Sequence, residues 1–211
     1  LLIAHGHPLE ESHRHFSHLM AIHPLGLIDI DHSDADARMV HASMADLTRL
    51  GTDYWCGYSF AWEASLAARA GDGARAAKAL ETFASAFVLR NSFHANGDQS
   101  GKGYSKFTYR PFTLEGNFAA AAGLHEMLLQ SHTGLIEVFP AIPDDWTDAS
   151  FDRLRAQGAF LVSAIRVAGN TESLTVVSET DSVCRLRSPW SGNVIELRLA
   201  SGGETTLTED P

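Results

Sequence analysis

Residues 58–89 read YSFAWEASLAARAGDGARAAKALETFASAFVL, and they contain two alanine-rich helical patterns joined by a glycine turn. Residues 58–70 form the first pattern, and Gly71 closes it. Residues 74–89 form the second, with one apolar face made by Ala76, Leu80, Phe83, Ala84 and Phe87. Alanine-rich faces let helices approach closely, and short turns between helices are typical of antiparallel hairpins. The stretch therefore predicts helix–helix packing as the basis of the fold.

Further helices are expected on both sides of this pair. Residues 33–50 carry apolar side chains at helical spacing, with Ser33 or Asp34 as the N-terminal cap. Residues 117–131 show the same periodicity. The stretch 90–114 has no periodicity but is rich in aromatic residues, so we expect an ordered loop that lines a pocket rather than a flexible linker.

After Gly134 the pattern changes from helical periodicity to short strands. Runs that are rich in Val and Leu, or that alternate apolar with charged residues, occur at 159–167, 173–178 and 195–199. We therefore expect an α+β chain of two domains. The first, in residues 1–134, is helical, and the second, in residues 135–211, is a small antiparallel β domain.

The composition of the 211-residue chain excludes several classes of protein. Hydrophobic residues make up 45%, enough for a buried core, and the formal net charge of -10 argues against a nucleic-acid partner. No apolar run approaches the ~18–20 residues that a membrane span needs. Cys56 and Cys184 form no metal-binding or redox motif. The sequence opens with Leu1 and has no initiator methionine, from which we expect it to start inside a longer protein.

The chain has 11 histidines, and seven of them lie within the first 32 residues. Zinc sites need imidazoles or thiolates that converge in a tetrahedron, and no H-E-x-x-H motif or cysteine pair accompanies the cluster. We therefore predict no metal and no other cofactor, with a His-ligated metal protein as an alternative hypothesis. Neutral imidazoles beside Arg14 can exchange hydrogen bonds with sugar hydroxyls. A third interpretation is that these are structural histidines at helix ends.

A carboxylate and two tryptophans are further candidates for a site. Glu115 lies where the aromatic loop meets a helix N-terminus, which favours an ionised carboxylate, and Asn117 can orient a water or a hydroxyl. An ordinary helix cap explains the same residues. Trp55 and Trp62 are seven residues apart and would share a helix face. Trp55 is the better candidate for stacking on a sugar ring, although core packing is the commoner role of such a pair.

Several stretches, in order along the chain, resemble glycoside hydrolase family 95, the inverting α-L-fucosidases and their relatives. His13–Leu19 is similar to the family's H-R-H-x-S-H-L signature, and Trp55–Gly73 to its W-x₆-W-x₆-A-R-x-G-D-G helix. Glu115–Phe118 and Glu126–His132 resemble its D-G-N-F-G and A-E-M-L-L-Q-S-H runs. Two further elements, P-A-L-P-x-x-W and L-R-A-R-G, are similar to Pro140–Trp146 and Leu154–Gly158.

The resemblance implies an architecture and a reaction. The helices would be the last helices of an (α/α)₆ barrel, followed by the family's C-terminal β domain, in an extracellular or periplasmic protein. The implied reaction is hydrolysis, with inversion, of a terminal α-L-fucose-like sugar on an oligosaccharide or glycoconjugate. Arg14 and His15 match residues that grip the sugar, and Glu115 matches the carboxylate that helps to activate the attacking water. The family's general acid and water-holding asparagines lie upstream of His13, so we expect them in an N-terminal part of the barrel against which this chain packs.

Two positions depart from the family pattern. Glu115 stands where the family has Asp, and Ala119 stands where it has Gly. One extra methylene displaces a carboxylate by about 1 Å, which can lower a rate by ~10²-fold. A divergent branch acting on another α-linked sugar, such as L-galactose, and a non-catalytic carbohydrate-binding fragment or degenerate homologue are therefore alternative hypotheses. The sequence names Glu115 as the catalytic candidate and, for substrate binding, Arg14, His15, Asn117 and Trp55.

Overall fold

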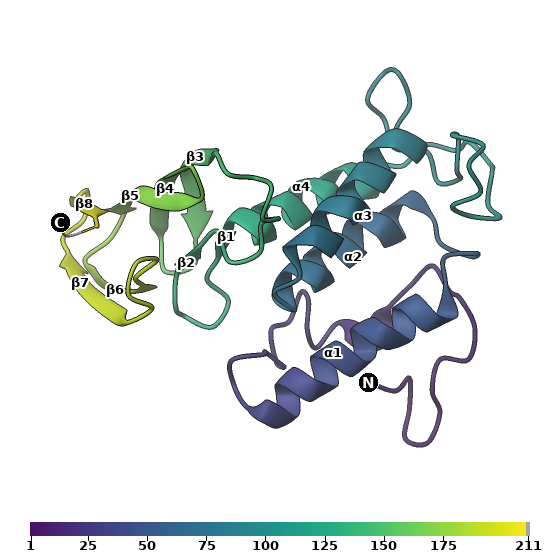
Figure 1. The fold of residues 1–211 in the computed structure, drawn as a ribbon, viewed down its shortest axis with the longest axis horizontal. Helices are drawn as coiled ribbons and strands as arrows, with labels where there is room; N and C mark the ends of the chain where they lie inside the picture. The colour runs from purple at the N-terminus through teal and green to yellow at the C-terminus, as the bar shows by residue number, and fades with distance from the viewer. Residues whose placement is uncertain (210–211) are drawn as a thin grey trace. The chain divides into compact units, whose positions relative to one another are not determined.

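The computed structural model describes residues 1–209, which form two compact units (Figure 1). The first unit is Leu1–Glu126 and is helical, and the second begins at Met127 and is built of β-strands. The predicted α+β class is therefore confirmed. The division between the units falls earlier than the expected boundary at residue 134, because helix α4 ends at Leu128 and strand pairing starts immediately after it.

The helices of the first unit follow the periodic stretches of the sequence. They are the short 3₁₀ helix η1 (Ser17–Leu19), α1 (Asp34–Leu50), α2 (Gly57–Arg69), α3 (Gly73–Ala86) and α4 (Glu115–Leu128). Side-chain caps fix two of the starts, because the Ser33 hydroxyl accepts a hydrogen bond from the backbone N–H of Asp36, and the Asp72 carboxylate accepts one from that of Arg75. The cap at Ser33 and the turn that follows α2 agree with the sequence prediction.

Helices α2 and α3 pack against each other as the expected hairpin (Figure 1). Arg75 in α3 joins three helices, since its guanidinium donates to the carboxylate of Glu63 in α2 and to the carbonyl oxygen of Met44 in α1. Helix α4 crosses α2 closely, because a Cβ added at Gly123 would lie 3.0 Å from the Cβ of Ala64. The small residues on α2 therefore allow the close packing that its alanine content predicts.

The stretch between α3 and α4 is ordered by main-chain hydrogen bonds although it forms no regular strand. The N–H of Gly97 donates to the carbonyl of Tyr109 at 2.9 Å, and the N–H of Asp98 donates to that of Phe107 at 2.7 Å. Asp98 is buried, and its carboxylate accepts hydrogen bonds from Ser100 and from the N–H of Tyr104. The two arms of the loop are thus tied together, which agrees with the prediction of an ordered loop.

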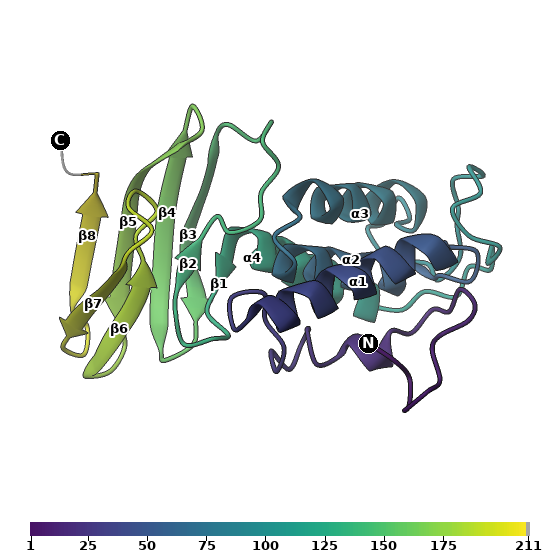
Figure 2. The ribbon, with the colours of Figure 1, turned by 60° about the horizontal axis from the view of Figure 1, so that its bottom comes forward.

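The second unit contains a four-stranded antiparallel sheet in the order β3-β4-β5-β8 and two antiparallel strand pairs, β1-β2 and β6-β7 (Figure 2). The strands are β1 (Leu129–Gln130), β2 (Glu137–Val138), β3 (Ala149–Ala156), β4 (Phe160–Val167), β5 (Asn170–Ser178), β6 (Ser182–Arg187), β7 (Val194–Leu199) and β8 (Glu204–Thr208). Phe160, Val162, Leu174, Val176 and Leu186 are central to its core. Strands β4, β5 and β7 match the sequence prediction.

Two remaining expectations concern cysteines and membranes. Cys56 and Cys184 are both free and buried, and burial raises the pKa of the Cys184 thiol to about 11. Across residues 1–209, none of the helices combines the length and the apolar character that crossing a bilayer requires.

Candidate active site

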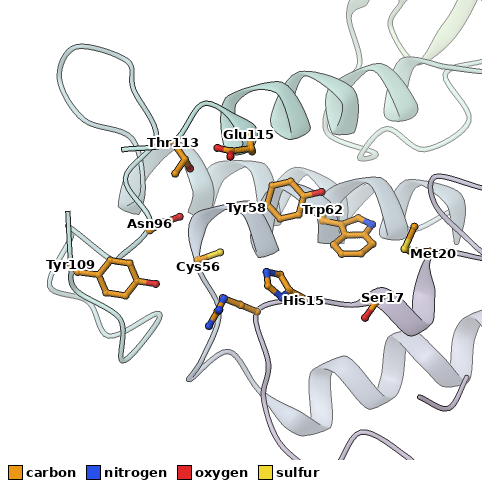
Figure 3. Close-up of a pocket in the computed structure, with 11 residues that line it drawn as sticks. His15, Ser17, Met20, Cys56, Tyr58, Trp62, Asn96, Tyr109, Thr113 and Glu115 are labelled. Carbon is orange, nitrogen blue, oxygen red and sulfur yellow. The ribbon is translucent and has the colours of Figure 1, made fainter. Parts of the chain in front are cut away.

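A pocket of about 580 Å³ opens in the first unit, within the size range of small-molecule sites (Figure 3). It is lined by Arg14, His15, Ser17, Met20, Cys56, Tyr58, Trp62, Asn96, Tyr109, Thr113 and Glu115. These residues come from the segment before α1, the first turns of α2, the aromatic loop and the start of α4. Figure 3 shows Glu115 and His15 on opposite sides of the pocket. The structure thus brings three of the five sequence candidates together: Arg14, His15 and Glu115.

Arg14 and His15 belong to a segment without regular secondary structure that side chains hold against α2. The Ser59 hydroxyl in α2 donates to the carbonyl oxygen of Arg14 at 2.7 Å. The ring of Phe16 is fully buried, with its centroid 4.9 Å from that of Trp55 and 5.4 Å from that of Trp62. Because the carbonyl of Arg14 and the ring of Phe16 are fixed in this way, the exposed side chains of Arg14 and His15 are directed from an anchored backbone.

Glu115 is the first residue of α4 and is exposed to the pocket. Its carboxylate accepts hydrogen bonds from its own backbone N–H and from the Thr113 hydroxyl, and these hold the pKa of Glu115 below its usual value. Free N–H groups at a helix N-terminus favour a negative charge for the same reason. Glu115 is therefore an anion at neutral pH, as the sequence prediction requires.

Two further titratable groups of the pocket, His15 and Tyr58, favour their neutral forms. Partial burial, with the positive charge of Arg14 beside it, lowers the pKa of His15, so its imidazole is uncharged at neutral pH. Burial raises the pKa of Tyr58, and the neighbouring Cys56 and Glu115 add to this effect. The pocket therefore combines one carboxylate and one guanidinium with neutral hydrogen-bonding groups, a set suited to a polyhydroxylated ligand.

Trp55 does not reach the pocket, which corrects the prediction that it stacks on a ligand. Its side chain is 2% exposed and packs edge-on against Phe16 and Phe60. The seven-residue spacing to Trp62 misled the interpretation, because Trp55 precedes the start of α2 at Gly57 and the helical period does not apply to it. Trp62 lines the pocket instead, with its indole N–H donating to the carbonyl oxygen of His23 at 3.1 Å.

Asn117 also lies outside the set of pocket-lining residues. Its side-chain oxygen accepts a hydrogen bond from the backbone N–H of His94 at 2.9 Å, and its amide nitrogen donates to the carbonyl of Ser92 at 2.8 Å. Both ends of the side chain are thus used to fasten the aromatic loop to the first turn of α4. The structure gives Asn117 a place behind Glu115 rather than beside a ligand.

The comparisons with known proteins agree with the sequence resemblance. Residues 6–128 match the model of the glycosyl hydrolase family 95 catalytic domain, and residues 130–208 match that of the glycoside hydrolase family 95 C-terminal domain. The chain belongs to glycoside hydrolase family 95. Alpha-L-fucosidase 2 from Arabidopsis thaliana is 31% identical over 203 residues, which are 95% of this chain and 23% of that relative. This family 95 chain thus spans about a quarter of the length of the relative it matches.

The family 95 pocket contains residues that sequence reasoning did not select. Met20, Tyr58, Asn96 and Thr113 line it. Only the position of Asn96 and Thr113 in the aromatic loop, which was expected to line a pocket, pointed to these two residues. A second cavity of about 530 Å³ is also lined by Met20, Tyr58, Trp62 and Glu115, and is otherwise mainly apolar. Among residues 1–209, no group of three or more His, Cys, Asp or Glu is placed to hold a metal ion.

Glycine at position 116 is required by close packing at the start of α4. A Cβ added at Gly116 would lie 2.5 Å from Nδ1 of His94, whose ring is fully buried. We therefore expect Gly116→Ala in this family 95 protein to lower the free energy of unfolding by about 1–3 kcal/mol, the usual cost of overpacking. Urea unfolding measures the effect. Ala120→Gly, which removes a methyl from the same helix without overpacking, is the control, and a larger loss in the control than in Gly116→Ala contradicts the expectation.

Proposed function

We propose that this chain forms the C-terminal part of an α-L-fucosidase-like glycoside hydrolase that releases a terminal α-L-fucose-like sugar by inversion. The observation that carries the proposal is the ionised carboxylate of Glu115 in a pocket that also contains Arg14 and His15. Membership of family 95 and the similarity to a plant protein named Alpha-L-fucosidase 2 support the substrate class. Oligosaccharides or glycoconjugates that end in such a sugar are the proposed partners.

The proposed roles follow from the charge and hydrogen-bonding groups of the pocket. Inversion needs a base that activates water on one face of the sugar and an acid that protonates the leaving oxygen on the other. Glu115 takes the first role, because its depressed pKa keeps it ionised. His15, which lies across the pocket from Glu115 (Figure 3), and its neighbour Arg14 bind sugar hydroxyls.

The remaining parts of the machinery are proposed to come from upstream sequence. Among the described residues that line the pocket, Glu115 is the only carboxylate, so the acid has to be supplied from elsewhere. We infer that an N-terminal region completes an (α/α)₆ barrel and contributes a general acid glutamate and water-holding asparagines. The surface of α4 supports this, because Phe118 is 69% and Leu124 is 40% exposed on a helix that is apolar nearly all round.

The test uses the full-length protein with an aryl α-L-fucoside as substrate, and an aryl α-L-galactoside and an aryl β-D-galactoside for comparison. We expect hydrolysis of the α-L-fucoside or its α-L-galactoside analogue and none of the β-D-galactoside. Proton NMR of the first product identifies the anomer, and the β-anomer is expected from inversion. Release of the α-anomer, or hydrolysis of the β-D-galactoside alone, contradicts the proposal.

A second candidate function is non-catalytic carbohydrate binding. It is favoured by the longer side chain of Glu115 in place of the aspartate of the family pattern, since a displaced carboxylate weakens catalysis without removing the sugar-binding groups. Isothermal titration calorimetry with L-fucose separates the two functions. Binding of the sugar by a full-length protein that hydrolyses none of the substrates supports the binding module.

The pH dependence of the reaction provides a separate prediction. A base has to be deprotonated to act, so kcat/KM is retained above the pKa of Glu115 and lost as the pH falls through it. Because hydrogen bonds from its own N–H and from Thr113 lower this pKa, we expect the acidic limb of the profile to lie below the ordinary glutamate value of 4.5. The profile of kcat/KM against pH measures it. A limb above that value contradicts the assignment of Glu115 as the base.

A further inference from the structure

His94 is a buried histidine directly behind the proposed base. It lies in the aromatic loop, its side chain is 0% exposed, and its ring centroid is 5.4 Å from that of Phe83. Its Nδ1 is 2.9 Å from the hydroxyl oxygen of Thr113, whereas its Nε2 is buried without a hydrogen-bond partner among the described residues. Burying an imidazole costs free energy unless hydrogen bonds replace those that it makes with water. The hydrogen bond between Nδ1 and Thr113 offsets part of this cost, and the question is what else it does.

The backbone around His94 holds the segment that contains Glu115 from both sides. The N–H of Thr113 donates to the carbonyl oxygen of His94 at 3.1 Å. The N–H of His94 donates to the side-chain oxygen of Asn117 at 2.9 Å. Residues 113 and 117 flank Glu115 in sequence, so its backbone is fixed at two points against one buried residue.

The direction of the side-chain hydrogen bonds follows from the donors available. Thr113 lies beside Glu115 in the pocket (Figure 3), and a hydrogen bond from Thr113 is among the causes that lower the pKa of Glu115. Because an ionised carboxylate only accepts, the threonine hydroxyl donates its single hydrogen in that bond. The hydroxyl oxygen is then the acceptor toward His94, and Nδ1 of His94 must carry the donated hydrogen. Burial lowers the pKa of His94 and outweighs the opposing effects of a hydrogen bond with the Thr113 backbone and of the Glu115 charge, so the neutral ring is favoured.

We propose that His94 and Thr113 are positioning residues for the base, in a chain that runs from His94 Nδ1–H to the Thr113 hydroxyl and from this hydroxyl to the Glu115 carboxylate. The inference rests on the proposed role of Glu115. A base acts efficiently only when its orientation is fixed, and a third group commonly fixes it. The buried ring supplies that constraint, because it is held between the backbones of Gly57 and Gly116 and cannot turn without displacing a helix start.

The experiment compares Thr113→Val, which keeps the shape and removes the hydroxyl, with Thr113→Ser, which keeps the hydroxyl and removes the methyl group. In the full-length protein we expect kcat to fall about tenfold in the valine variant with little change in KM, as for the loss of one hydrogen bond to a charged group. The serine variant is expected to retain most of the wild-type kcat. Equal losses in the two variants overturn the proposal, since they report packing of the side chain.

A second readout does not depend on activity. The Glu115 carboxyl is titrated by ¹³C NMR in protein labelled at glutamate, and its resonance is identified by its loss in Glu115→Gln. The pKa of Glu115 is expected to rise in Thr113→Val and to stay unchanged in Thr113→Ser. The other titratable groups that face the pocket or this chain are the same in both variants: Arg14, His15, Cys56, Tyr58, His94 and Tyr109. An identical Glu115 pKa in the valine variant and the wild type overturns the proposal.

These readouts separate a failure of the inference from a failure of the proposed function. If the wild-type protein hydrolyses no α-L-fucoside or α-L-galactoside, the proposed function fails, and the titration alone decides whether Thr113 holds the carboxylate.

Replacing His94 tests the hydrogen bond between its Nδ1 and the Thr113 hydroxyl. Asn places an N–H at the same number of bonds from Cα as Nδ1, so His94→Asn is expected to keep the Glu115 pKa low, and His94→Leu is expected to raise it. Equal pKa values in these two variants overturn the role of His94.

Discussion

Replacement of Glu115 by Gln in the full-length protein is expected to lower kcat by about 10²- to 10⁴-fold, the usual contribution of a general base. The amide has nearly the same shape as the carboxylate but cannot accept a proton from water. Because Glu115 is exposed, the change leaves no buried group unpaired. KM is expected to change little, since the proposed sugar-binding residues are Arg14 and His15, and His15 lies across the pocket from Glu115. Steady-state kinetics on an aryl α-L-fucoside measure both constants.

Glu115→Asp is the matched comparison, because it keeps the charge and restores the residue of the family pattern. The aspartate would lie at the same first residue of α4, where the free N–H groups of the helix start favour an ionised carboxylate. We therefore expect the aspartate variant to retain far more activity than the glutamine variant. Glutamine and aspartate variants with equal activity would show that the charge at this position does not take part in the reaction.

Removal of the guanidinium of Arg69 is expected to have the largest effect on stability. Arg69 is 6% exposed, and its Nε and Nη2 donate to the two carboxylate oxygens of Glu126 at 2.5 and 2.9 Å. Arg69→Met keeps the apolar stem but leaves a largely buried carboxylate without this partner. Breaking a buried ion pair from one side costs about 3–5 kcal/mol, and we expect a loss of that order in the free energy of unfolding of the helical unit. Urea unfolding followed by tryptophan fluorescence measures it.

Two further variants show whether the loss comes from burial of the pair. The double variant Arg69→Met/Glu126→Gln removes both charges and is expected to be more stable than Arg69→Met alone. Lys78→Met breaks an ion pair with Glu81 in which both side chains are more than half exposed, and its unfolding midpoint is expected to match the wild type. An unfolding midpoint for Arg69→Met that equals that of Lys78→Met would show that the buried pair contributes nothing.

The helices were predictable from sequence because their signals are local. Ser33 and Asp72 cap helix starts through their own side chains, and the alanines between residues 58 and 70 mark a helix that neighbours approach closely. The sequences of strands β3, β6 and β8 show weaker strand patterns than those of β4, β5 and β7. In β3 most side chains are exposed or half-buried, and the pairing register shifts between Phe151 and Leu154, so the apolar alternation is interrupted.

Arg14, His15 and Glu115, which the structure places in one pocket, were candidates both from their chemistry and from the family motifs. Trp55 was preferred to Trp62 for contact with a ligand, and the structure reverses this order, because Trp62 lines the pocket and Trp55 is buried. Spacing predicts a shared face only within one helix, and the helix start at Gly57 separates the two tryptophans. Which of them faces the pocket depends on where Phe16 packs, a contact between distant parts of the chain.

His94 shows a second limit of sequence reasoning. Its chemistry depends on a hydroxyl at Thr113, on the two main-chain contacts around Glu115, and on glycine at two helix starts. None of these partners is adjacent to it in sequence. A single histidine in an aromatic loop therefore looks the same, from sequence, as the exposed histidines near the N-terminus.

The His94 ring occupies the space that side chains at positions 57 and 116 would otherwise fill. A side chain added at either Gly57 or Gly116 would overlap that ring. Relatives that keep histidine at position 94 should therefore keep both glycines, and relatives in which position 94 is small should be free to vary at 57 and 116 together. The residues at these three positions are thus expected to change together as the family diverges, and a change at one of them would indicate that the start of α4, with the proposed base, is held differently in that branch.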